Sequence, residues 1–290
     1  MAEPGARTFV LTVTCKDAIG VVAETTGFLA QHQGFIVESQ QYADLDSGRF
    51  FMRIEFKAGG PRFPPLDMLH SQFAGIADRF GMTWQIDDSA EKLRILVMVS
   101  KGGHCLNDLL HRWRTGTLPV EIPLVISNHE DLRSLCEWHG IPFLYLPVTA
   151  DTRAEQEAKL LQLVDEHRID LVVLARYMQV LSAETCTALA WRCINIHHSF
   201  LPSFKGARPY HQAHARGVKL IGATAHFVTP DLDEGPIIEQ ASERVDHNFT
   251  ADAMATAGRD IEAIVLARAV CWAAERRVLP NGNRTVVFRR

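Results

Sequence analysis

The chain has 290 residues, of which 47% are hydrophobic and 22% charged, which is an ordinary globular composition. This excludes a disordered chain, a collagen-like fibre and a small disulfide scaffold, and the length suits one large domain or two ordinary ones. The formal net charge of −4 provides no domain-wide basic field for nucleic acid. No apolar stretch is long enough to span a bilayer, and Met1–Ala6 lacks the layout of a signal peptide. Six scattered cysteines without a CxxC pair indicate reduced thiols, so we expect a cytoplasmic protein without nucleic-acid or membrane partners.

The first part of the chain predicts a small unit of strands and helices. Alternating apolar residues indicate strands, amphipathic stretches indicate helices, and Asp46–Gly48 forms a hairpin turn. The expected elements are strand 8–14, helix 21–33, strands 36–44 and 49–56, helix 66–80 and strand 82–86. This βαββαβ order predicts a ferredoxin-like fold, with helices on one face of an antiparallel sheet.

From residue 93 onward, apolar strands alternate with helices. The expected strands are 93–99, 120–127, 143–146, 171–175, 192–196, 223–229 and 236–244, and the expected helices are 106–114, 130–139, 153–167, 182–190 and 250–276. Buried Val- and Leu-rich strands in this alternation predict an α/β domain with a doubly wound, mostly parallel, Rossmann-like sheet. The polar stretch 87–92 ends the first unit, which gives predicted domains of residues 1–88 and 89–290.

Candidate catalytic residues follow the predicted strands, because ligands of such sheets bind beyond the carboxyl ends of the strands. Asn195 and His197 are two apart, so in extended backbone they share a side and can both face a developing oxyanion. Asp233, in the polar turn 229–235, can orient the imidazole or raise its pKa. The trio suits hydrolysis or transfer of an acyl group without a covalent nucleophile, since the chain has no GxSxG elbow.

Each of these residues also has a structural alternative. A histidine at a strand end is commonly only a hydrogen-bonding group, and an aspartate in a Pro/Gly turn commonly only forms the turn. A metal site is disfavoured, because the adjacent His197 and His198 would point to opposite sides of a strand and the chain has no HExxH motif. The residues alone therefore indicate an α/β enzyme, with acyl transfer as one candidate reaction.

Several separated motifs resemble the folate-dependent formyltransferases, over about residues 93–290. The motifs are LVVLARYMQVLS at 171–182, NIHHSFLPSFKG at 195–206, HFVT at 226–229 and LDEGPII at 232–238. The resemblance implies that Asn195, His197 and Asp233 are catalytic. It also implies a folate pocket lined by Met178, Gln179, Val180, Leu181, Thr229, Pro230, Asp231 and Leu232.

Within that family, three segments are similar to the formyltetrahydrofolate deformylases: 104–106 (HCL), 197–200 (HHSF) and 258–262 (GRDIE). The similarity implies hydrolysis of 10-formyltetrahydrofolate to tetrahydrofolate and formate, which supplies formate for purine synthesis and balances one-carbon pools. It implies no cofactor and no metal. His198 and His104 are then expected on the acceptor side, with packing and helix capping as their respective alternatives.

Residues 8–86 resemble an ACT domain, a small fold that often binds amino acids. The resemblance places Asp17 and Gly20 in a ligand loop and implies an amino-acid effector, glycine or methionine, although both residues also suit a plain turn. Exposed sheet edges of this unit predict a homo-oligomer. Two other functions stay open from the sequence: a formyltransferase to an amine acceptor, and an amino-acid-sensing regulatory protein with a remnant folate domain.

Overall fold

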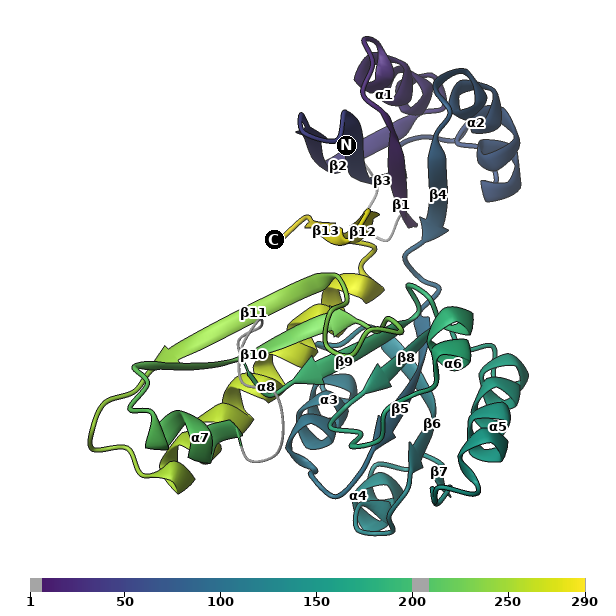
Figure 1. Ribbon diagram of the computed structural model, residues 1–290. Coiled ribbons are helices and arrows are strands. Elements are labelled where there is room, and N and C mark those ends of the chain that lie inside the picture. The colour runs from purple at the N-terminus through teal and green to yellow at the C-terminus, as the bar shows by residue number, and fades with distance from the viewer. Residues whose placement is uncertain (1–6, 200–208, 290) are drawn as a thin grey trace. The chain divides into compact units, whose positions relative to one another are not determined.

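The computed structural model describes residues 7–199 and 209–289 (Figure 1). The chain forms two compact units. The first contains the residues up to Lys92 together with Glu275–Leu279 and Val286–Arg290, and the second contains Leu93–Ala274 and Pro280–Thr285. The predicted domain 1–88 did not include the two C-terminal segments. The part of the resemblance at residues 200–206 lies outside the described residues.

The first unit has the predicted βαββαβ order. Its elements are β1 (Thr8–Lys16), α1 (Val21–Gln31), β2 (Gly34–Asp44), β3 (Arg49–Ala58), α2 (Leu66–Phe80) and β4 (Thr83–Asp88). The strands pair antiparallel in the order β2-β3-β1-β4. Alternate apolar residues of the strands form one core with the two helices, including Leu11, Ile54, Leu29 and Phe73, all fully buried.

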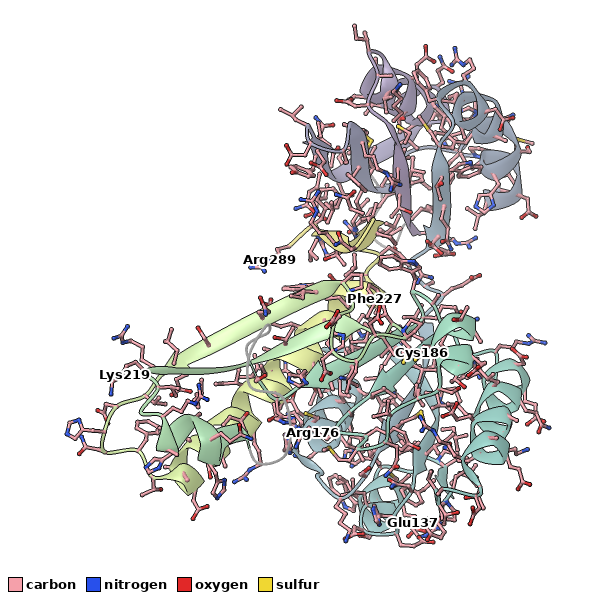
Figure 2. The ribbon with its side chains drawn as sticks, viewed as in Figure 1. Glu137, Arg176, Cys186, Lys219, Phe227 and Arg289 are labelled. Carbon is pink, nitrogen blue, oxygen red and sulfur yellow. The ribbon has the colours of Figure 1, made fainter. Side chains whose placement is uncertain are left out.

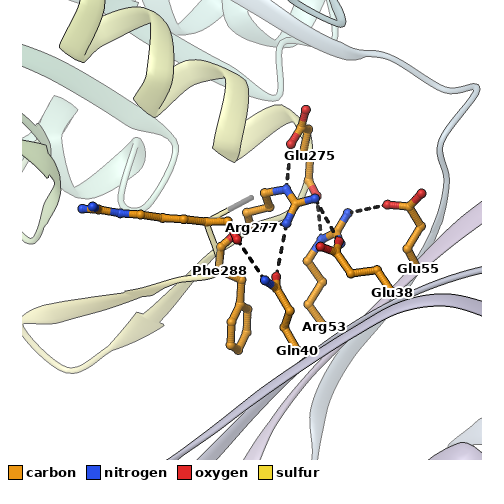
Figure 3. A network of polar contacts seen from close by, with 8 residues as sticks. Glu38, Gln40, Arg53, Glu55, Glu275, Arg277 and Phe288 are labelled. Carbon is orange, nitrogen blue, oxygen red and sulfur yellow. Dashed lines mark hydrogen bonds and ion pairs between the residues drawn. The ribbon is translucent and has the colours of Figure 1, made fainter.

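The other face of this sheet meets the C-terminal segments of the chain. Phe51 on β3 packs with Leu279 and Phe288 in a separate apolar cluster. Beside it, two arginines with only 2–3% of their side chains exposed share one carboxylate: Glu38 Oε2 lies 2.7 Å from Arg53 and 2.9 Å from Arg277 (Figure 3). Charge-assisted hydrogen bonds of this kind are stronger than neutral ones, so the end of the chain is fixed to its beginning.

We expect Arg277→Met to lower the free energy of unfolding of the first unit by about 3 kcal/mol, because it removes one partner of a buried ion network and leaves the others under-compensated. Urea unfolding followed by circular dichroism measures the change. Arg79→Met is the matched control: Arg79 pairs with Glu24 at 2.7 Å, but both are largely exposed, so a loss of less than about 1 kcal/mol is expected. Equal losses in the two variants would contradict the role given to the buried network.

The second unit is built on a seven-stranded sheet. Its strands are β5 (Leu93–Val99), β6 (Val120–Ser127), β7 (Phe143–Tyr145), β8 (Leu171–Leu174), β9 (Cys193–His197), β10 (Leu220–Phe227) and β11 (Ile237–Arg244). Its helices are α3 (His104–Arg114), α4 (Arg133–Trp138), α5 (Arg153–Glu166), α6 (Ala183–Ala188), α7 (Pro209–Ala215) and α8 (Ala251–Ala274). The strand order is β11-β10-β9-β8-β5-β6-β7, parallel from β9 to β7 and antiparallel at β10 and β11. The predicted doubly wound, mostly parallel sheet is confirmed.

Helices cover both faces of this sheet (Figure 1). Side chains of α5 and α6 pack on one face, and α8 contacts α3, β9 and β10 on the other. From β5 the chain continues to β6 and β7 on one side, and then crosses to β8 and β9 on the other side of β5. The strand order therefore reverses between the neighbours β5 and β8. Ligands of doubly wound sheets bind at this switch point, beyond the carboxyl ends of the strands.

Two elements were not predicted, the short helix α7 and a terminal hairpin. The hairpin joins β12 (Val278–Asn281) to β13 (Arg284–Val287), and Gly282 in its turn has φ +63°. The Asn281-Gly282 pair is a strong local signal for such a hairpin. The long C-terminal helix ends at Ala274. None of the described helices is long and apolar enough to cross a membrane.

Candidate active site

The three predicted catalytic residues lie on the wall of one cavity. Asn195 and His197 are on β9, with their pleat positions two apart as predicted, and Asp233 comes from the turn between β10 and β11. His197 Nδ1 lies 3.1 Å from Asp233 Oδ1. An imidazole paired with a carboxylate in this way can take up a proton and hold it.

The turn that carries Asp233 has a constrained backbone. Asp233 has φ +59°, in the left-handed region that aspartate tolerates better than most residues. At Gly235, any Cβ would overlap the carbonyl oxygen of Phe227, and the Phe227 amide donates to the carbonyl of Pro236 at 2.9 Å. The Asp-Glu-Gly-Pro sequence therefore has a structural reason: glycine lets the turn close onto β10, which brings the carboxylate to His197.

Local charges keep Asp233 ionised. Burial alone would favour the neutral carboxyl, but the hydrogen bond and the charge interaction with His197 hold the pKa of Asp233 below its ordinary value. His197 Nε2 is buried and has no hydrogen-bond partner among the described residues. Since the other ring nitrogen faces Asp233, Nε2 is the atom of His197 that a substrate can engage.

His226 on β10 supports Asn195, a role that the sequence analysis did not give it. The carbonyl of Phe227 lies 2.8 Å from His226 Nδ1, so Nδ1 carries the proton and Nε2 accepts. Burial lowers the pKa of His226, which keeps the ring neutral. Asn195 Nδ2 lies 3.3 Å from that Nε2. This contact fixes the amide with its NH₂ group toward His226, and the second N–H of Nδ2 remains free to donate to a ligand.

The predicted folate pocket surrounds these residues. The cavity has a volume of about 210 Å³ and includes both predicted pocket segments in its lining. Met178, Val180 and Leu232 are more than half exposed, although they are apolar. Exposed apolar side chains around a cavity are typical of a ligand site. Of the eight predicted pocket residues, Asp231 alone does not line the cavity; its carbonyl accepts a hydrogen bond from the Thr229 hydroxyl.

His198 does not point away from His197, and this expectation was wrong. The two rings stack, with centroids 4.9 Å apart and planes at 19°. The physical reason is that β9 ends at His197, so the alternation of a strand does not extend to His198. His198, Arg176 and Met178 also line a second cavity of about 590 Å³, so the two cavities adjoin there.

His104 lies in the lining of this second cavity, at the start of α3, and contacts a buried carboxylate. His104 Nε2 is 2.7 Å from Glu262 Oε2 on α8, and Glu262 is only 1% exposed. Tyr210 donates to the other oxygen, Glu262 Oε1, at 2.8 Å, and Arg176 Nε lies 3.3 Å from Oε2. Burial favours the neutral acid, but the His104 hydrogen bond and the Arg176 charge hold the pKa of Glu262 below its ordinary value.

We expect prolonged chelation to leave turnover unchanged, because the predicted catalytic residues can act on an acyl group without an ion. Among the described residues, ligand atoms of His104, Cys105 and Glu262 come within 4.8 Å of one another. Burial raises the pKa of the Cys105 thiol well above its usual range, and Glu262 is already engaged, so this set suits a metal poorly. Turnover assayed after dialysis against a chelator tests this. Activity that is lost and then restored by a divalent ion would contradict it.

In the first unit, Asp17 and Gly20 form the loop before α1. Gly20 has φ +99°, which favours glycine, and the Asp17 amide donates to the carbonyl of Gly48 at 2.9 Å. These features account for the loop's shape, and an effector at this loop stays a prediction.

The fold and the site define a protein of the formyl transferase class, and residues 93–270 match the family model for formyl transferase. A glycinamide ribonucleotide transformylase from Symbiobacterium toebii matches only part of the chain: it is 32% identical with a TM-score of 0.65, and the match covers 68% of this chain and 95% of that one.

Other relatives match both units. A formyltetrahydrofolate deformylase from a Corynebacterium species is 52% identical over 97% of this chain and 98% of its own length. The crystal structure of another, from Burkholderia mallei, is 54% identical with a TM-score of 0.93, and the match covers 98% and 100% of the two chains. The chain belongs to the formyltetrahydrofolate deformylase family.

Proposed function

We propose that the protein hydrolyses 10-formyltetrahydrofolate to tetrahydrofolate and formate, in the cytoplasm and without a metal or cofactor. The observation that carries the proposal is the meeting of Asn195, His197 and Asp233 on the wall of the cavity lined by the predicted folate-pocket segments. The relatives that match both units, which are named for deformylation of formyltetrahydrofolate, support it.

In the proposed reaction, Asp233 positions a water molecule and takes its proton, directly or through His197. The water oxygen attacks the formyl carbon, and the oxyanion that develops accepts hydrogen bonds from Asn195 Nδ2 and His197. A proton then passes to N10 of the folate, the C–N bond breaks, and formate leaves. Electrostatic stabilisation of this kind acts most strongly where charge develops in the transition state. His198 and His104 belong to the acceptor side, where the water enters.

Release of formate from 10-formyltetrahydrofolate alone tests the proposal. A hydrolase forms formate and tetrahydrofolate in equal amounts without any amine present. A formyltransferase would form neither until an amine acceptor is added, and a regulatory protein would bind folate without turnover.

We also propose that the first unit is an ACT domain that binds glycine or methionine near Asp17 and Gly20, within a homo-oligomer. Ile19 is fully exposed in this loop, and Leu45 is 87% exposed in the neighbouring β2–β3 turn. Exposed apolar side chains at adjoining turns favour a covering partner.

Turnover of the full-length protein with and without each amino acid, together with light scattering, tests this second proposal. Ile19→Asp is expected to weaken assembly and the amino-acid response while the unfolding of the unit is unchanged. If turnover responds to neither amino acid, the unit serves assembly only. If the wild type and Ile19→Asp are both monomers, the proposed homo-oligomer is contradicted.

A further inference from the structure

Arg176 connects His198 to the buried carboxylate of Glu262. One of its guanidinium nitrogens, Nη1, lies 2.6 Å from His198 Nδ1, and Nε lies 3.3 Å from Glu262 Oε2. A guanidinium can only donate, so His198 Nδ1 must accept and cannot carry a proton at the same time. The contact therefore selects one form of the ring, the neutral imidazole with its proton on Nε2.

The backbone at Arg176 is specialised for this position. Arg176 follows the carboxyl end of β8 at the switch point of the sheet, and its φ of +66° lies in the left-handed region. This backbone conformation is energetically unfavourable for arginine, and non-glycine residues held in it cluster at functional sites. The side chain, which is labelled in Figure 2, lines both cavities and is about one-fifth exposed.

The surroundings of His198 make its charge state important for His197. The charged and titratable groups that act on His198 are Arg176 after β8, His197 on β9, Asp233 from the β10–β11 turn and Glu262 on α8. Burial first, and then the charges of Arg176 and His197, lower the pKa of His198 to about 4. A second cation stacked on His197 would oppose uptake of a proton by that ring.

We propose that Arg176, anchored by Glu262, is a positioning residue for the hydrolysis: it holds His198 neutral, so that no second cation opposes uptake of a proton by His197. The inference rests on the proposed function for its kinetic consequence, but not for the tautomer itself. Arg176 touches no reacting atom in this role and acts through His198.

The tautomer can be observed without turnover. In full-length protein labelled with ¹⁵N-histidine, long-range ¹H–¹⁵N spectra distinguish the two neutral tautomers and the cation, and the loss of one signal set in His198→Gln identifies His198. We expect the Nε2–H tautomer from pH 8 down to pH 5.5. In Arg176→Met, which keeps an aliphatic stem without the donors, the pKa of His198 is expected to rise above its wild-type value, while the remaining burial keeps it below the ordinary value of about 6.5.

The kinetic consequence follows from that titration. Protonated His198 would then be more abundant at pH 5.5 than at pH 8, so kcat of Arg176→Met is expected to fall between these pH values beyond any change in the wild type. The limit is roughly tenfold, because a histidine of ordinary pKa is about nine-tenths protonated at pH 5.5. Arg176→Lys, which keeps the cation, is expected to recover much of the loss. Arg259→Met is the matched control, since Arg259 lines the second cavity and donates to Thr256 rather than to His198.

Two results would overturn the proposal: a His198 tautomer and titration unchanged in Arg176→Met, or the same pH-dependent loss in Arg259→Met. A loss in Arg176→Met that is equal at every pH, with the His198 spectrum unchanged, would show a merely structural role. If the wild type makes no formate while the tautomer behaves as expected, the proposed function fails and the positioning of His198 stands.

Discussion

Asp233→Asn is expected to reduce kcat by about 10²- to 10⁴-fold, the usual contribution of general acid–base catalysis. The amide cannot accept a proton from water and cannot stabilise a cationic His197, whose Nδ1 lies 3.1 Å from the carboxylate. Asparagine also tolerates the left-handed backbone at this position, where φ is +59°. The turn should therefore keep its shape, so that the loss is chemical. Steady-state turnover and a binding titration with folate measure the two effects separately.

Asp231→Asn is the control for this substitution. Asp231 is in the same turn, but it is exposed and does not line the cavity. We expect nearly full turnover in this variant. If Asp233→Asn keeps more than about a tenth of wild-type turnover, or if both substitutions lower turnover equally, the general-base role given to Asp233 is contradicted.

Asn195→Ala is expected to lower kcat by about 10²- to 10³-fold with little change in KM. This is the usual effect of losing one donor to an oxyanion, since the bond forms fully only in the transition state. The contact with His226 orients the amide NH₂ and leaves one of its N–H groups for the substrate.

Leu232→Ala gives the opposite pattern and serves as the comparison. Leu232 is an apolar residue of the cavity mouth that is 58% exposed, so its contact with the folate ring is expected in both the ground state and the transition state. KM should rise while kcat stays near its wild-type value. A change in KM alone for Asn195→Ala would assign that residue to binding and not to the oxyanion.

The fold was largely predictable from the sequence, because period and chain order are local signals. Strand alternation and the change of rhythm at residue 93 predicted both sheets. The hairpin at Asn281-Gly282 had a local signal that was overlooked. No local signal predicts that the segments around Arg277 and Phe288 belong to the first unit, since their partners Glu38 and Phe51 are more than 200 positions away.

The candidate site shows the same division between local and distant information. Spacing alone placed Asn195 and His197 on one side of β9, and the structure gives them those positions. The stacking of His198 on His197 depends on the residue at which β9 ends, which is the least certain part of a sequence-based prediction. Arg176 directly follows the predicted strand 171–175, and residues beyond the carboxyl ends of strands are candidates for the site, so it could have been predicted. Glu262 lies within a helix, and its place at the site depends on contacts with three residues from other parts of the chain, His104, Tyr210 and Arg176.

The attachment of the chain's end to its beginning has a consequence for biosynthesis. The sheet of the first unit leaves the ribosome early, but the residues that complete it are translated more than 200 positions later. Leu279 and Phe288 pack with Phe51, and Arg277 joins Arg53 at Glu38. The first unit therefore cannot reach its final form until residues 275–288 have been made, and until then its β3 presents uncovered apolar and charged side chains. Domains commonly fold in the order of their synthesis. In this chain the order is partly reversed, so a product that stalls or terminates before residue 275 would lack part of its N-terminal unit, even though the whole sheet of the second unit had been made.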